Sequence, residues 1–109
     1  MKRHGLSVEY VLAAARDVRE RSGYYSAKAP GLEKRFIAAL TECERFVVSN
    51  PEGLPRIDDS TDIRSAVLRR FPFRLLYVVR GDVVLVLAVA HTAREPSQFL
   101  ERSRPDPRS

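Results

Sequence analysis

The spacing of apolar residues changes from two to about 3.6 near the start of the chain. Between residues 5 and 10, Leu6, Val8 and Tyr10 alternate with polar residues, which predicts a short strand with one buried face. From Val11 onward, apolar positions recur at helical spacing, so an amphipathic helix of about four turns is expected. Its stripe consists of Val11, Ala14, Ala15, Val18, Ser22 and Tyr25.

A second helical stripe follows a proline. Pro30 is tolerated in a helix only at its start, so a new helix is expected to begin there. The pair Asn50-Pro51 predicts its end, because proline disfavours helical geometry in the residue before it. The two segments together predict a helical hairpin. The second stripe comprises Leu32, Phe36, Ala39, Leu40, Cys43 and Val47.

The second half of the chain is expected to form strands. Residues 49–62 hold turn formers and acids without a period, which predicts a loop. From Ile63 the period is two, and Gly81-Asp82 marks a hairpin turn between two apolar runs. The run 83–90 is apolar on both faces, which indicates an inner strand and a natural partner for the first strand, although the pattern leaves that pairing open. Residues 97–102 fit one helical turn.

This order, β-α-α-β-β-β, predicts an α+β fold in which a helical hairpin packs on a small, twisted, mainly antiparallel sheet. A length of 109 residues favours one domain over residues 1–109, with about 1–5 and 103–109 flexible. The sequence contains no apolar run long enough for a membrane span and no signal-peptide pattern at its start. We therefore expect a soluble, cytoplasmic protein that does not associate with membranes.

Candidate metal and redox chemistry is sparse. The single cysteine, Cys43, falls on the apolar stripe of the second helix, so it is interpreted as a core residue. Positions 4, 43 and 91, which carry the two histidines and the cysteine, lack metal-ligand spacing. The five glycines are widely separated and form no phosphate-binding loop. The sequence therefore predicts no metal and no cofactor.

Positive charge is concentrated in the second half of the chain. Residues 1–62 contain equal numbers of basic and acidic residues, whereas residues 63–109 carry the whole excess, and every basic residue there is arginine. The guanidinium group presents a rigid set of donors suited to carboxylate and phosphate. An acidic partner, either protein or nucleic acid, is therefore expected. We also expect these arginines to gather on one side of the sheet.

Several short motifs, in their order along the chain, resemble the ParE/RelE superfamily of type II toxins, also called plasmid stabilisation proteins. The similarity covers roughly residues 6 to 96. It implies the fold predicted above and a cognate antitoxin whose acidic, partly disordered segment wraps the toxin. The motifs are Tyr24-Tyr25, PGLEKRF, the pair NP at the helix end, Arg64, FPFRLLY and AHTAREP.

The resemblance implies one of two activities. RelE-like toxins cut messenger RNA on the ribosome, and ParE-like toxins inhibit DNA gyrase. RNA cleavage requires a general base and a general acid, roles that arginine cannot fill. His91 could serve with Arg94 and with arginines 64 and 74 near the phosphate, but its complementary partner would have to be Glu95 or Tyr77. Gyrase inhibition is therefore favoured, and whether the protein is an enzyme stays open.

Each candidate residue also has a structural interpretation. His91 can be a hydrogen-bonding residue at a strand end, and Arg69 and Arg70 can protect a sheet edge from aggregation. A third possibility is an inactive relative that only binds other proteins. The residues expected to contact the target or the antitoxin are Arg64, Arg69, Arg70, Arg74, His91 and Arg94, with His91 and Arg94 as the catalytic candidates if the protein is a ribonuclease.

Overall fold

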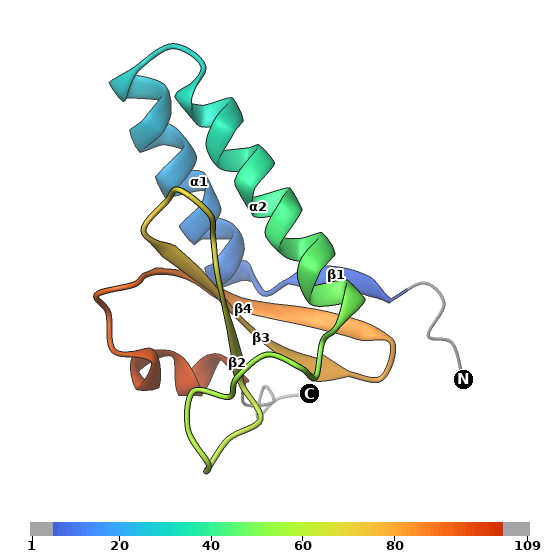
Figure 1. Cartoon of the computed structure of the whole chain (residues 1–109). Coiled ribbons are helices and arrows are strands. Elements are labelled where there is room, and N and C mark those ends of the chain that lie inside the picture. The colour runs from blue at the N-terminus through green and yellow to red at the C-terminus, as the bar shows by residue number, and fades with distance from the viewer. Residues whose placement is uncertain (1–5, 104–109) are drawn as a thin grey trace.

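A computed structural model describes residues 6–103 of the chain. The α+β prediction is confirmed, and the elements follow the expected order (Figure 1). Of the predicted flexible segments 1–5 and 103–109, residues 1–5 and 104–109 lie outside the described residues, and Ser103 ends the last helical element. The elements are β1 (Ser7–Tyr10), α1 (Leu12–Lys28), α2 (Leu32–Ser49), β2 (Arg64–Val67), β3 (Phe73–Arg80), β4 (Val83–His91) and a 3-10 helix, η1 (Pro96–Ser103).

The four strands form one sheet in the order β1-β4-β3-β2. Strand β4 runs parallel to β1 and antiparallel to β3, and β3 is antiparallel to β2. The run 83–90 is therefore an inner strand, as its apolar character on both faces indicated. It is also the partner of the first strand, a pairing that the sequence pattern left open. A parallel β1 requires a long crossover connection, and the α1–α2 hairpin supplies it.

The two helices meet at a short link around Pro30. Helix α1 continues through Gly23 to Lys28, so this glycine does not end it. Pro30 lies before α2, and Gly31 precedes the helix with a φ of 81°, a conformation that favours glycine. Helix α2 ends at Ser49, directly before the predicted stop at Asn50. The hairpin prediction is confirmed.

Both faces of the sheet are covered. The α1–α2 hairpin packs on one face, while η1 and the loop before β2 cover the other (Figure 1). The buried residues of the helix face include Phe36, Leu40, Val47, Phe73, Leu75, Tyr77, Val84 and Val86. Those of the η1 face are Ile63, Leu76, Val78, Leu87, Ala88, Ala90 and Phe99.

A β-bulge in β4 interrupts the alternation that the sequence predicted. Leu76 lies opposite Ala88 and Tyr77 lies opposite Val86, so Leu87 is an extra residue in β4. An extra residue reverses which face the following side chains occupy. As a result, residue 89 and, by alternation, residue 91 point to the helix face. This bulge determines where His91 lies.

A half-buried ion pair holds the bulge in place. Strand β1 ends opposite Val86, so the outer edge of β4 beyond that point has no neighbouring strand. The Asp17 carboxylate on α1 accepts the Val89 N–H at 3.0 Å and pairs with Arg102 of η1 at 2.9 Å. Arg102 also donates to the Leu87 carbonyl at 2.9 Å. Two side chains thus satisfy backbone groups that would otherwise be unpaired.

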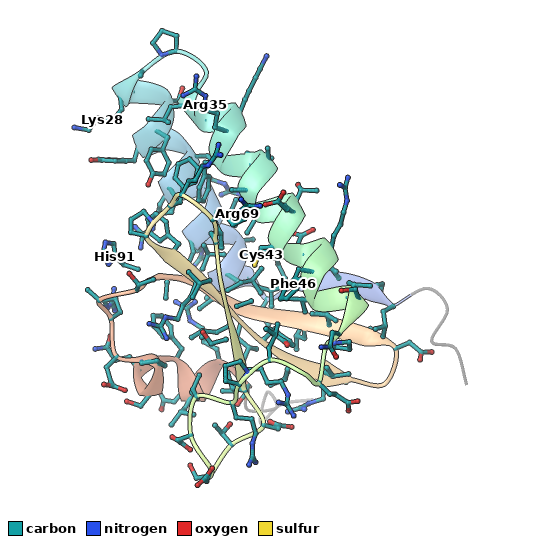
Figure 2. The ribbon with its side chains drawn as sticks, viewed as in Figure 1. Lys28, Arg35, Cys43, Phe46, Arg69 and His91 are labelled. Atoms are coloured by element: carbon teal, nitrogen blue, oxygen red, sulfur yellow. The ribbon has the colours of Figure 1, made fainter. Side chains whose placement is uncertain are left out.

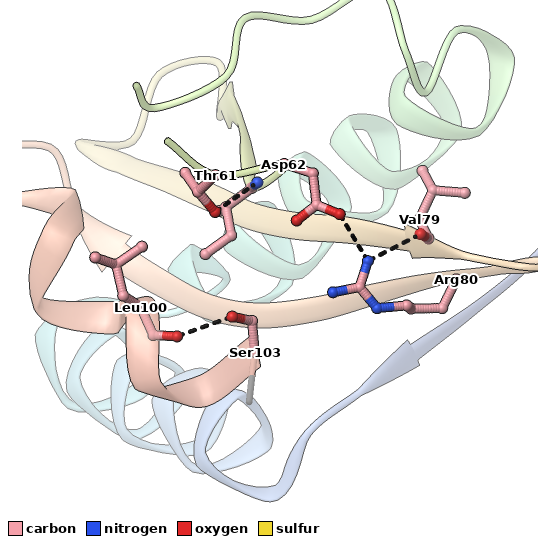
Figure 3. A network of polar contacts seen from close by, with 7 residues as sticks. Thr61, Asp62, Val79, Arg80, Leu100 and Ser103 are labelled. Atoms are coloured by element: carbon pink, nitrogen blue, oxygen red, sulfur yellow. Dashed lines mark hydrogen bonds and ion pairs between the residues drawn. The ribbon is translucent and has the colours of Figure 1, made fainter. Parts of the chain in front are cut away.

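The loop between α2 and β2 is tied to the sheet by polar contacts. Arg64 donates to the Leu54 carbonyl, and the Tyr77 hydroxyl donates to the Pro51 carbonyl at 2.7 Å. Arg80 pairs with Asp62 at 2.9 Å (Figure 3). Within residues 6–103, no helix is long and apolar enough to cross a membrane. No group of three or more potential metal ligands occurs among those residues either.

Candidate protein-binding groove

A groove runs along α2 beside the segment that joins β2 to β3. It consists of two adjoining cavities of about 510 and 370 Å³, which share Glu42 and Arg69. We call this feature the α2 groove. The larger cavity is lined by Leu32, Arg35, Ala38, Ala39, Glu42, Arg69, Arg70 and Phe71, and the smaller one by Glu42, Cys43, Phe46, Val67 and Arg69.

The spacing of residues on α2 creates the groove. Phe36, Leu40 and Val47 face the sheet and are buried, which leaves a neighbouring face of the helix beside the β2–β3 segment. On that face Ala38 and Ala39 have small side chains, so another chain could approach the helix backbone closely. The lining residues recur at about every third or fourth position, as expected for one helical face.

Large apolar side chains are exposed in the smaller cavity. Phe46 is 56% exposed and Val67 is 62% exposed, although both are strongly apolar. They come from separate elements, α2 and β2, and line the same cavity as Cys43. Figure 2 shows Phe46 and Cys43 on α2. An apolar surface that two elements build together is typical of a protein interaction site.

Arginines lie around this apolar surface. Arg69 is 4.0 Å from Glu42, and because both side chains are largely exposed this ion pair adds little stability. Arg70 has a φ of 68°, a left-handed conformation that is uncommon for a residue with a side chain. No ion pair of Arg35 or Arg70 occurs among the described residues. The groove therefore combines an apolar floor with available positive charge (Figure 2).

Cys43 belongs to the core and forms part of the groove floor. It is 7% exposed, and its thiol donates to the Ala66 carbonyl at 3.7 Å. Burial, with Glu44 and Glu42 nearby, raises the pKa of the thiol to about 11. The thiol is therefore protonated and unreactive at neutral pH, which agrees with its interpretation as a core residue.

Three of the expected site arginines are engaged in internal contacts. The guanidinium of Arg64 holds the loop after α2 through the Leu54 carbonyl. Arg74 donates to the Thr92 carbonyl at 3.0 Å and, by alternation with Leu76 and Val78, projects toward the η1 face. Arg94 makes two hydrogen bonds to the Gln98 side chain, at 3.0 and 2.8 Å. Each guanidinium therefore has at least one internal partner, although the buried Nε atom of Arg74 has none.

The expectation that the arginines gather on one side of the sheet is not met. Arg69 and Arg70 lie in the α2 groove, whereas Arg74 and Arg94 lie with η1 on the other face. Arg80, at the far end of β3, is neutralised by Asp62 (Figure 3). The excess charge was real, but its distribution depends on strand alternation and on loop contacts that composition does not reveal.

His91 is exposed at the end of β4. Its Nδ1 atom accepts the Ala93 N–H at 3.0 Å, and its ring lies 5.6 Å from that of Phe73 in an edge-on arrangement. Of its two proposed catalytic partners, Tyr77 is fully buried and donates to the Pro51 carbonyl, so it cannot reach a substrate beside His91. Glu95 is exposed.

The sequence analysis did not identify several residues that the structure brings to these surfaces. Arg21 and Arg35 come from helices in the half of the chain without net charge, so the charge count passed over them. Phe46 lies off the predicted stripe of α2, and an aromatic residue outside the stripe was the available signal. Val67 was grouped with Ile63 and Ser65 by strand alternation, but it is the last residue of the edge strand β2 and is exposed.

The fold is that of a small α+β protein, and the α2 groove gives it an arginine-lined, partly apolar surface. Residues 8–96 match the family model described as ParE toxin of type II toxin-antitoxin system, parDE. The chain belongs to this family of toxins. No match was found among curated protein sequences.

Solved structures support the same assignment. The chain is similar to a structure described as the chromosomal ParDE TA system from P. aeruginosa, with 19% identity over 79% of this chain and 95% of that chain and a TM-score of 0.65. It is also similar to the toxin-antitoxin complex RelBE2 from Mycobacterium tuberculosis, with 29% identity over 82% of this chain and 93% of that chain and a TM-score of 0.52. The first similarity shows the fold, and the second, at higher identity, agrees with a toxin.

Proposed function

We propose that a cognate acidic antitoxin neutralises this toxin by binding in the α2 groove, and that the free toxin inhibits DNA gyrase in the ParE manner. The observation that carries the antitoxin proposal is the groove itself, in which Phe46 and Val67 are exposed beside Arg69, and the adjoining cavity carries Arg35 and Arg70. A site of this kind fits an amphipathic segment that has carboxylates along one side and apolar residues along the other.

The physical chemistry of the groove favours a polypeptide over a small ligand. The two cavities adjoin along α2, so an occupant can be long and follow the helix. Burying Phe46 and Val67 would remove apolar area from water at about 25 cal/mol per Å². Carboxylates beside Arg69 and Arg70 would add orientation and a faster association rate. Both similar structures are described as toxin–antitoxin systems or complexes, which supports a protein occupant.

Gyrase inhibition is favoured over RNA cleavage by the family and by the surroundings of His91. The matching family model is the ParE toxin, not a ribonuclease model. The guanidinium of Arg94 donates to the Gln98 side chain. Tyr77 is buried, and its hydroxyl donates to the Pro51 carbonyl. With Tyr77 buried and Arg94 engaged, only Glu95 of the named groups is left to act with His91, which supports inhibition through binding rather than through phosphodiester chemistry. Gyrase and ribosomes are both cytoplasmic, so either target places the toxin in the cytoplasm.

The antitoxin proposal is tested with the short acidic protein expected to be encoded beside this gene. We expect Arg69→Glu and Phe46→Ala each to weaken binding of that antitoxin by roughly 10- to 100-fold, measured by titration calorimetry, because they remove charge complementarity and an apolar anchor. Arg45→Glu is the matched control, since Arg45 is exposed on the same helix outside the groove. An equal loss with Arg45→Glu would refute the groove as the binding site.

The target is tested separately with the free toxin. Purified toxin is expected to inhibit supercoiling by gyrase and to leave messenger RNA intact in an in vitro translation reaction. Ribosome-dependent cleavage that disappears with His91→Ala would instead establish the RelE-like activity. If expression without antitoxin leaves growth unaffected and neither assay responds, the chain is a relative that only binds other proteins.

A further inference from the structure

The aromatic ring of Phe73 contacts two groups that can bind an anion. The guanidinium carbon of Arg21, on α1, lies 5.0 Å from the ring centroid, and the imidazole of His91, at the end of β4, lies 5.6 Å from it. The guanidinium carbon of Arg21 and the centre of the His91 ring can therefore be no farther apart than the sum of these two distances. We call Arg21, Phe73 and His91 the α1 corner. None of its residues lines the α2 groove.

The bulge in β4 is what brings His91 to this corner. Without the extra residue at Leu87, side chain 91 would alternate to the η1 face. The Nδ1 atom of His91 accepts the Ala93 N–H, so in the neutral imidazole the proton resides on Nε2. Nε2 is thus the donor atom that an incoming anion would meet, and the ring is exposed at the surface (Figure 2).

Arg21 has unmet hydrogen-bonding capacity. Its Nε atom is buried and has no acceptor, and no ion pair of Arg21 occurs within the described chain. By contrast, Arg94 and Arg102 also stack on an aromatic ring, that of Phe99, but both have oxygen acceptors. A positive charge held over a ring without a counter-ion is suited to an external anion.

A second cation and an exposed ring continue the surface along α1. Tyr24 is 56% exposed, and the ammonium of Lys28 lies 5.2 Å from its ring centroid. Lys28 follows Arg21 by two helical turns on the same side of the helix, which corresponds to about 10 Å along the axis. Figure 2 shows Lys28 and His91 on the same side of the molecule. The surface therefore presents cations in series with an aromatic ring between them.

We propose that the α1 corner binds single-stranded nucleic acid. One backbone phosphate lies between Arg21 and His91, a base stacks on Tyr24, and a following phosphate meets Lys28. Aromatic side chains interleaved with cations are the usual way to hold a single strand, because every base offers a π-face and every linkage a negative charge. This site goes beyond the antitoxin and gyrase proposals and depends on neither.

The series of contacts favours a polynucleotide over a free anion or an acidic peptide. A single phosphate would be satisfied at Arg21 and His91 and would make no use of Tyr24 or Lys28. An acidic peptide would gain most where apolar surface accompanies charge, as in the α2 groove, whereas at this corner Tyr24 is the large apolar side chain that is exposed. Stacking on Tyr24 would contribute about 1–3 kcal/mol per base in an alanine substitution.

The test measures fluorescence anisotropy of a labelled single-stranded DNA of about 12 nucleotides with the full-length chain. We expect Arg21→Gln, His91→Gln and Tyr24→Ala each to weaken binding by at least about fivefold. Arg21→Gln should also reduce the salt dependence by about one phosphate contact. Arg19→Gln is the matched control on α1, since Arg19 is exposed and, two residues before Arg21, lies on a different side of the helix. It should change affinity less than about twofold.

Two results would overturn the proposal. Equal weakening by Arg19→Gln and Arg21→Gln would mean attraction by net charge without a site. Displacement of the DNA by inorganic phosphate at low millimolar concentration would mean a site for a free anion. Thermal unfolding of each variant confirms that it folds. Both His91→Asn and His91→Gln remove the imidazole ring, so His91→Asn should bind no better than His91→Gln. Binding of the antitoxin is unaffected in every case, so the two proposals fail independently.

Discussion

The α2 groove and the α1 corner both carry arginine, but their surroundings differ. In the groove, Arg69 lines the same cavity as the exposed apolar residues Phe46 and Val67, and Arg70 lines the adjoining cavity. At the corner, Arg21 lies over the ring of Phe73. The corner residues line neither of the two cavities along α2. The same cation next to different neighbours selects different ligands: an amphipathic peptide in the groove and a polyanion at the corner.

The two surfaces are connected by an aromatic cluster. Phe71 lines the groove and Phe73 carries the corner, and both rings lie within 6 Å of that of Phe36. Tyr25 adds contacts to all three of these rings. Partial burial and the neighbouring Tyr24 raise the pKa of Tyr25, while the positive charge of Arg21 acts in the opposite direction. The packing of these aromatic rings therefore supports both surfaces.

The largest expected effect comes from removing one ring of this aromatic cluster. Phe36→Ala should lower the free energy of unfolding by about 3–5 kcal/mol, because Phe36 is fully buried among the other rings and its removal leaves a cavity. Urea unfolding followed by circular dichroism measures the loss. Both antitoxin binding and DNA binding should weaken together.

Phe46→Ala is the matched control on the same helix. Because Phe46 is 56% exposed, its removal should change stability by no more than about 0.5 kcal/mol while it weakens antitoxin binding. A stability loss as large as that of Phe36→Ala would show that Phe46 belongs to the core and that the groove floor is not a free surface.

The sequence predicted the elements and their layers because each has a local cause. Period-two and helical stripes identify which residues must be buried together, and Pro30 and Pro51 mark where helices can begin and end. The apolar run 83–90 also indicated that β4 lies inside the sheet. These signals act over a few residues, so they can be read along the chain.

The site could not be predicted as completely, since it depends on contacts between distant residues. The bulge at Leu87 gives no local signal, yet it moves His91 to the helix face. Arg74 and Arg94 looked available in the sequence, but Arg74 donates to the Thr92 carbonyl and Arg94 to the Gln98 side chain. Charge counts locate an excess of arginine and do not show which guanidinium groups are already bound.

The ion pair between Asp17 and Arg102 allows the corner to be perturbed without the groove. Asp17→Ala should lower the free energy of unfolding by about 1–3 kcal/mol, because it leaves the Val89 N–H without an acceptor and Arg102 without its partner. DNA binding should weaken several-fold as the end of β4 loosens around His91, while antitoxin affinity stays unchanged. Chemical unfolding and the two binding assays measure these effects.

Asp62→Ala provides the comparison for that ion pair. Asp62 pairs with Arg80 at the same distance of 2.9 Å, but both side chains are about half exposed, so the loss should stay below about 1 kcal/mol. Equal destabilisation by the two variants would mean that the bulge contacts contribute nothing beyond a surface ion pair. A fall in antitoxin affinity with Asp17→Ala would show that the two surfaces are coupled through α1.

The smallest expected effect is a pH dependence that reports on the groove floor. Burial raises the pKa of Cys43 from its usual 9.0 to about 11, so the folded state favours the protonated thiol. The resulting stabilisation is complete below pH 9 and is lost as the pH rises toward 11, by about 1 kcal/mol at pH 10. Cys43→Ala should lack this part of the decline, while the ionisation of buried tyrosines affects both proteins equally. Urea unfolding between pH 7.5 and 10 measures the difference, and parallel curves would mean that water reaches the thiol and that the groove floor is open beneath Phe46.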